Sequence, residues 1–172
     1  MDLTKKLFPA LDGLIKSIND KADSLKGTIK TGRTHLMDAM PIDFSEELKA
    51  WSSQLESSKE LLNVIGKKFL ELSQGGTAVG SGINAHKQFA KLFAQEITKL
   101  TKNKYKFTPA KNFYHELSAQ DCSVQLSGEL KNLAVILMKI SNDLRWMNSG
   151  PLAGISEIEL KALQPGSSIM PG

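Results

Sequence analysis

Two adjacent serine side chains, Ser167 and Ser168, are the residues of this chain with the clearest potential for chemistry. They stand between two Pro-Gly pairs, at 165–166 and 171–172. Proline fixes φ and glycine gives access to the left-handed region, so this stretch does not suit the interior of a helix or strand. We therefore predict a loop over 164–172 whose backbone can approach a ligand closely. Composition alone also allows a flexible Ser/Gly tail.

A second candidate is His35, which lies in a polar segment, 28–42, beside Arg33, Thr34 and Asp38. An imidazole can accept and donate a proton near neutral pH, so it suits acid/base chemistry. The neighbouring arginine could neutralise a carboxylate on a substrate. On spacing alone, an ordinary polar loop is the simpler interpretation.

Other kinds of site find little support. His86 and His115 each lie next to a charged residue on an expected helix, which is typical of surface positions. No His/Cys/Asp/Glu cluster has metal-ligand spacing, so no metal site is predicted. The glycine-rich segment 73–84 lacks a preceding strand and a phosphate-binding lysine, so a nucleotide site is not predicted either.

Composition indicates a soluble globular domain. The 172 residues are 41% hydrophobic and 23% charged, and no apolar run approaches the roughly 18 residues that span a bilayer. We predict no membrane partner and a cytoplasmic location, or the mitochondrial matrix if the source is eukaryotic. The single Cys122 fits a reducing compartment. The net charge of +4 is mild, and the basic, aromatic run 99–111 is typical of a solvated loop, so no nucleic-acid partner is predicted.

Apolar residues recur every three or four positions over four stretches, which predicts helices over 3–25, 43–72, 85–102 and 112–147. Asp43 with Glu46 is typical of a capping box, and Asn84 is expected to cap the third helix. The segments 73–84, 103–110 and 152–164 are predicted to be irregular, and 28–41 to be a loop or a short extended piece.

Two of these helices are about 30 residues or longer, so each is longer than a compact domain of this size is wide. The two shorter helices cannot cover the apolar stripes of both. The pattern therefore predicts an all-α protein in which an oligomer completes a helical bundle.

Three segments resemble, in order, the signature segments of the fumarase/aspartase superfamily. Residues 30–41 resemble the Gly-Arg-Thr-His-Leu-x-Asp-Ala-x-Pro segment of class II fumarases, and 75–84 resemble their second glycine-rich segment. Residues 142–151 and 164–172 resemble the run into the catalytic Ser-Ser loop. The resemblance implies a long antiparallel helical bundle, of which residues 1–172 form the central domain, cut at both ends.

The resemblance also implies an activity, the reversible hydration of fumarate to L-malate, without metal or organic cofactor. Ser167 would be the base that takes the C3 proton of malate, and His35 would be the acid/base that acts with the water. Thr34 and Ser168 would bind the dicarboxylate. A serine base requires preorganised positive potential from backbone N–H groups and cationic side chains. The family supplies part of it with a lysine directly after the position of Gly172.

This chain departs from the family pattern at four positions, none of which removes a catalytic group. Met37 stands where glutamine is usual, Ser81 where threonine is usual, Ser156 where glycine is usual, and Lys161 where proline is common. Family active sites combine segments from three subunits of a homotetramer, together with an N-terminal domain and a region after the Ser-Ser loop. We therefore expect these 172 residues to be inactive by themselves.

Two alternatives remain open. Aspartases usually carry glutamine where His35 stands, so the histidine favours fumarase over aspartase or another superfamily lyase. A non-catalytic helical oligomerisation module, or a degenerate relative, would use the same apolar stripes. The joint presence of His35, Thr34, Ser167 and Ser168 argues against loss of function.

Overall fold

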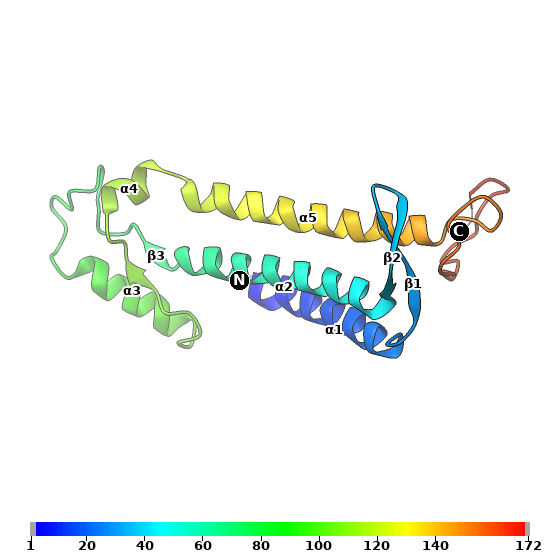
Figure 1. Ribbon diagram of the computed structural model, residues 1–172. Coiled ribbons are helices and arrows are strands. Elements are labelled where there is room, and N and C mark those ends of the chain that lie inside the picture. The colour runs from blue at the N-terminus through cyan, green and yellow to red at the C-terminus, as the bar shows by residue number, and fades with distance from the viewer. Residues whose placement is uncertain (1–2, 171–172) are drawn as a thin grey trace. The chain divides into compact units, whose positions relative to one another are not determined.

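The computed structural model describes residues 3–170 and divides into two compact units, 1–132 and 133–172, each described by itself here. Helices dominate the chain, so the all-α class is confirmed in its coarse form, with small paired strands added (Figure 1). The first unit contains a π-helix Leu3–Leu7, α1 Phe8–Ser24, β1 Ile29–Thr34, β2 Met37–Asp43, α2 Phe44–Lys68, β3 Glu71–Leu72, α3 Phe89–Leu100, β4 Thr108–Pro109 and α4 Phe113–Ser118. The last helix, α5 Asp121–Met147, begins in the first unit and ends in the second.

The core of the first unit lies between α1 and α2, which pack side by side in opposite directions (Figure 1). Helix α2 buries most of the apolar stripe that the sequence predicts. The stripe predicted on α1 was partly wrong, because Leu14 is 37% exposed whereas Ile15 is buried. Small buried serines on α2 allow close approach of the neighbouring helices, and Ser58 donates a hydrogen bond to Glu129 of α5 at 2.7 Å. The buried apolar residues of the pair are Leu11, Ile15, Ala22, Phe44, Leu48, Trp51, Leu55 and Leu62.

The second predicted helix is confirmed but ends at Lys68, four residues earlier than expected. The chain leaves the helix because Glu71 and Leu72 form the short strand β3, which pairs in parallel with β4. The predicted linker 103–110 is therefore partly a strand. Within residues 3–170, no helix is both long and apolar enough to cross a membrane.

The predicted start of the third helix was wrong. Helix α3 begins at Phe89 without a side-chain cap, whereas Asn84 lies in the glycine-rich loop at a φ of +63°. The loop continues past Asn84 because it is closed by its own turns: the Gly76 carbonyl accepts hydrogen bonds from the N–H groups of Gly80 and Gly82 at 2.9 and 3.0 Å. The loop prediction for 73–84 is confirmed.

The predicted fourth helix is two helices, α4 and α5, so a single helix over 112–147 was wrong. Asn112 caps α4 by accepting from the His115 N–H at 3.1 Å, and Ala119 is extended. Across this break, the imidazole Nε2 of His115 bonds to Asp121 at 2.8 Å. An aspartate in the first turn of α5 also complements the helix dipole.

The second unit consists of the later part of α5 and the irregular chain after it. Leu133, Ile140 and Met147 are its buried helical residues, spaced by seven. The chain then folds back on the helix end, where the Met147 carbonyl accepts from the Glu157 N–H at 2.8 Å. Asn148 accepts from the Leu160 N–H at 2.9 Å. The prediction that 152–164 is irregular is confirmed. These hydrogen bonds attach the first half of that segment to the end of α5.

We expect Gly80→Ala to lower the free energy of unfolding by about 1–3 kcal/mol. Gly80 has a φ of +111°, and a β-carbon there would lie 2.6 Å from the backbone nitrogen of Tyr114 in α4. Gly128→Ala is the control, because this helical glycine has open space around it and alanine there should stabilise by up to about 1 kcal/mol. Urea unfolding followed by circular dichroism measures both. Equal midpoints for the two variants would contradict the packing of this loop on α4.

Candidate active site

Thr34 and His35 lie at the tip of an antiparallel hairpin formed by β1 and β2. Thr34 pairs with Met37, so His35 and Leu36 form a two-residue turn. Their φ values of 51° and 64° are those of a type I′ turn, which favours Asn-Gly. A β-carbon in this region costs roughly 1–2 kcal/mol. The hairpin thus holds a histidine at a strained tip, as residues at functional sites often are.

A hairpin is more structure than the sequence indicated for 28–42. Gly32 makes it possible, because a β-carbon there would lie 2.6 Å from the Met40 carbonyl oxygen. The register shifts beside this glycine, between Thr31 and Arg33, as in a β-bulge. Because His-Leu is not a typical turn pair, no turn signal revealed the hairpin in advance.

The base of the hairpin is fastened to α2. The side chain of Asp43 caps α2 by accepting from the Ser45 N–H at 2.8 Å, and it also accepts from the Gly27 N–H at 2.8 Å. The nearby Ser45 side chain, followed by the backbone N–H groups of Gly27 and Ser45, holds the pKa of Asp43 below its usual value. Lys30 forms an ion pair with Glu47 and lies 5.2 Å from the centre of the Phe44 ring. The tip is therefore positioned relative to the start of α2.

The lowered pKa of Asp43 predicts a pH dependence of stability. A depressed folded-state pKa contributes stability above the unfolded-state value of about 3.9, and this contribution is lost as pH falls through both pKa values. Asp43→Asn should keep the cap, since asparagine caps equally well, but lose this part of the acid dependence. Asp43→Ala should lower the melting temperature at all pH values. Thermal unfolding between pH 2.5 and 7 measures both, and an unchanged acid slope in Asp43→Asn would contradict the assignment.

Around the hairpin tip the surface is apolar. Thr34 and His35 are exposed, and Leu36, Met37 and Met40 are 77%, 70% and 80% exposed. An apolar surface beside a strained histidine suits contact with another part of the protein.

Ser167 and Ser168 lie in the exposed C-terminal segment of the second unit. The Oγ of Ser167 accepts hydrogen bonds from the N–H groups of Ile169 and Met170 at 3.3 and 3.1 Å. The Ser167 N–H in turn donates to the Met170 carbonyl at 2.7 Å. Two donors aimed at one hydroxyl oxygen stabilise negative charge on it. Sequence reasoning required such donors without identifying them, and the predicted loop is confirmed for 164–170.

The candidate residues thus fall into two groups. Thr34 and His35 share one turn in the first unit, and Ser167 and Ser168 share one loop in the second. The last two residues of the predicted loop, Pro171 and Gly172, lie outside the described residues.

The remaining histidines have structural surroundings. His86 is exposed and accepts from the Gln88 N–H at 3.2 Å. His115 is exposed, and its hydrogen bond with Asp121 raises the pKa of the imidazole. Both surface predictions are confirmed. In the described part of the chain, no three His, Cys, Asp or Glu side chains are grouped to hold a metal ion.

Comparison with known proteins gives a consistent assignment. The model of a lyase family matches residues 1–172. The chain is 51% identical over 172 residues to the class II fumarate hydratase 2 of Pseudomonas aeruginosa, covering all of this chain and 37% of that protein. It is 46% identical over 168 residues to the class II fumarate hydratase of Bacillus subtilis, covering 98% of this chain and 36% of that protein.

Solved structures agree. The class II fumarase of Schistosoma mansoni superposes with a TM-score of 0.92 and 36% identity, covering 100% of this chain and 39% of that one. A fumarate lyase:delta crystallin from Brucella melitensis superposes with a TM-score of 0.87 and 38% identity, covering 95% and 35%. The chain spans a little over a third of the length of the curated relatives it matches. Since the family model matches every residue, this chain belongs to the lyase family of the class II fumarate hydratases.

Proposed function

We propose that the protein to which these residues belong is a fumarate hydratase, which interconverts fumarate and L-malate without metal or organic cofactor. The observation that carries the proposal is the pair of backbone N–H groups on the Ser167 hydroxyl oxygen. Identities near 50% to proteins named class II fumarate hydratase support the choice of substrate. A cytoplasmic location belongs to the same proposal.

The reaction needs a base for a weakly acidic C–H bond. In the dehydration direction, the Ser167 alkoxide takes a proton from C3 of L-malate, and the negative charge moves onto the adjacent carboxylate. The C2 hydroxyl then leaves as water after it receives a proton, which gives fumarate. The N–H groups of Ile169 and Met170 favour the alkoxide because they point at the oxygen that carries the charge.

His35 supplies the proton to the leaving hydroxyl and, in hydration, accepts one from the attacking water. The two-residue turn fixes its backbone, so little ordering remains to be done when substrate binds. Thr34, one position earlier, and Ser168, one position after the base, contribute hydroxyl groups that hold the dicarboxylate.

We also propose that the native assembly is a homotetramer whose long helices form an antiparallel bundle. Several apolar side chains of α5 are exposed in the single chain, including Leu130, Val135 and Met138 at 39%, 48% and 59%. Packing of α5 against helices of other subunits would bury them. The apolar hairpin tip suits the same kind of contact, so one active site can combine Thr34 and His35 of one subunit with the Ser-Ser loop of another.

The test is an ultraviolet assay on the protein as encoded, including whatever flanks these residues. Fumarate absorbs strongly where malate does not, so malate should produce rising absorbance and fumarate falling absorbance. Ammonia release from aspartate, with no change in malate, would reassign the protein to aspartase. No reaction with either compound would favour the non-catalytic module.

A further inference from the structure

The hairpin that carries His35 is a narrow ribbon. In the part of the chain that the structure describes, β1 and β2 pair only with each other, with no third strand beside them. A two-stranded ribbon is at best marginally stable by itself. The direction in which the hairpin projects from the start of α2 (Figure 1) therefore depends on the contacts at its base.

A small change at the base of the hairpin produces a larger displacement at its tip. His35 follows Lys30 by five residues, which is roughly 16 Å at the rise of an extended strand. A rotation of about 4° at the base thus moves the tip by about 1 Å. Misplacement of a reacting group by about 1 Å can cost about 10²-fold in rate. The contacts at the base therefore control the reactivity of a group at the tip.

Two contacts attach the base to α2 at different points. The Asp43 carboxylate accepts hydrogen bonds from the N–H groups of Gly27 and Ser45, which fixes the end of the hairpin at the start of the helix. Lys30 of β1 forms its ion pair with Glu47, which lies further on, in the first turn of α2. One attachment point would let the hairpin rotate about it, whereas two points define its direction.

The ion pair of Lys30 and Glu47 is shielded from water. The two side chains are 10% and 26% exposed. The Lys30 ammonium group also lies 5.2 Å from the centre of the ring of Phe44, a residue of the buried core. An ion pair is stronger where water is excluded, and removal of one partner leaves the other charge without compensation. This pair should therefore hold its geometry more firmly than an exposed ion pair.

We propose that Lys30 and Glu47 are positioning residues for the reaction. Their ion pair holds the hairpin at the angle that places the His35 imidazole against the leaving hydroxyl of malate. This role rests on the proposed function, because it requires His35 to be the acid/base. The pair acts through His35, so it affects proton transfer to the hydroxyl and not removal of the C3 proton, which belongs to Ser167.

Lys30→Met in the protein as encoded separates these two proton transfers. Methionine retains most of the length of lysine but has no charge. At saturating malate, we expect kcat for dehydration to fall by roughly tenfold or more, while exchange of the C3 proton with solvent deuterium stays within about threefold of wild type. A general loss of stability or assembly would lower both rates together, so the ratio of exchange to dehydration is the readout. Lys30→Arg keeps the charge and should retain most of the kcat.

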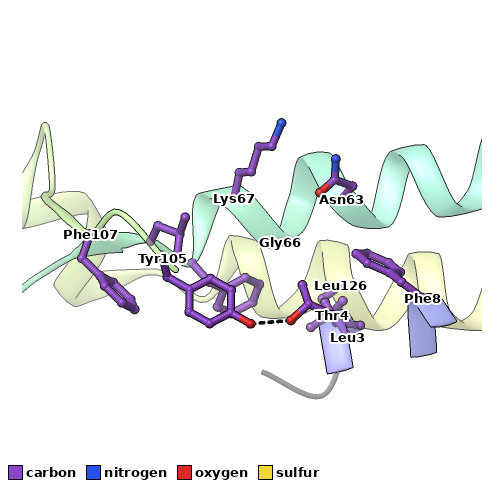
Figure 2. Close-up of a pocket in the computed structure, with 11 residues that line it drawn as sticks. Leu3, Thr4, Phe8, Asn63, Gly66, Lys67, Tyr105, Phe107 and Leu126 are labelled. Atoms are coloured by element: carbon purple, nitrogen blue, oxygen red, sulfur yellow. Dashed lines mark hydrogen bonds between the residues drawn. The ribbon is translucent and has the colours of Figure 1, made fainter. Parts of the chain in front are cut away.

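A similar arrangement elsewhere on α2 provides the matched control. Lys59 forms an ion pair with Asp12 of α1 and lies 6.0 Å from the centre of the Phe8 ring, which Figure 2 shows. Lys59 follows Glu47 by 12 residues, or about 18 Å along the helix. Lys59→Met should leave the ratio of exchange to dehydration unchanged, because this pair does not contact the hairpin.

Glu47→Gln removes the charge of the other partner and replaces Lys30→Met if that variant does not fold. With wild-type protein that converts malate, an unchanged ratio in the folded variant would overturn the positioning role and leave the proposed function standing. An equal rise of the ratio in Lys59→Met would also overturn it, because the effect would then not be specific to the hairpin. Wild-type protein that converts no malate would overturn the proposed function, and this role with it.

Discussion

Ser167→Ala is expected to lower kcat for malate dehydration by about 10²–10⁴-fold in the protein as encoded. The substitution removes the oxygen that we propose accepts the C3 proton, and the N–H groups of Ile169 and Met170 then lose the acceptor to which they donate. Alanine leaves the surrounding Pro-Gly pairs intact, so the loop backbone should persist. Initial rates over a range of malate concentrations separate kcat from KM.

The adjacent hydroxyl provides the matched control for this substitution. Ser168→Ala removes a proposed contact with the dicarboxylate but not the base, so it should mainly raise KM, by roughly tenfold. Exchange of the malate C3 proton with solvent deuterium gives an independent readout: Ser167→Ala should abolish it and Ser168→Ala should retain it at saturating malate. If Ser167→Ala exchanges the proton at the wild-type rate, another group is the base.

His35→Asn is expected to lower kcat by about 10²-fold or more in both directions, because asparagine cannot donate and accept the proton of the water. Asparagine is well tolerated at positive φ, so it should preserve the turn, where His35 has a φ of 51°. Steady-state kinetics with malate and with fumarate measures kcat in the two directions.

Leu36→Gly separates the chemistry of the turn from its conformation. Leu36 has a φ of 64°, where a side chain costs roughly 1–2 kcal/mol, so glycine should raise the melting temperature. The double variant His35→Asn/Leu36→Gly should have the same kcat as His35→Asn. Recovery of activity in the double variant would indicate that the histidine acts through the shape of the turn.

The sequence pointed to two groups of candidate site residues because each group lies in a short segment that resembles a signature segment of the fumarase/aspartase superfamily. His35 with Thr34, and Ser167 with Ser168, are adjacent pairs in segments whose glycines and prolines exclude helix. The apolar periodicity also predicted that α1 and α2 are helices, and most of the stripe on α2 is buried as predicted. Periodicity is reliable for long helices because every turn repeats the same requirement.

The errors lie where hydrogen bonds between residues a few positions apart override the apolar periodicity. Asn84 was predicted to cap the third helix. It lies instead in the preceding glycine-rich loop, where the Gly76 carbonyl accepts hydrogen bonds from two N–H groups of the same loop. The apolar stripe from 112 to 147 predicted one helix. The helix is interrupted at Ala119, which is extended and lies between His115 and Asp121, two residues joined by a hydrogen bond. Ser156 stands where the family pattern has glycine, and its φ of 51° explains the preference for glycine there.

By itself, the sequence determined the helical class, and its resemblance to the fumarase/aspartase superfamily pointed to two candidate site segments with residues suited to acid/base chemistry. The helical class follows from periodicity and the resemblance follows from neighbours in the chain, so neither needs a folded structure to be recognised. Only the tertiary structure decided that 28–42 is a strained hairpin, and that two N–H groups converge on the oxygen of Ser167. The hydrogen bond from Ser58 to Glu129 also required it, because these residues are 71 positions apart in the chain. Contacts of this kind depend on which segments meet in space, and no local pattern encodes that meeting.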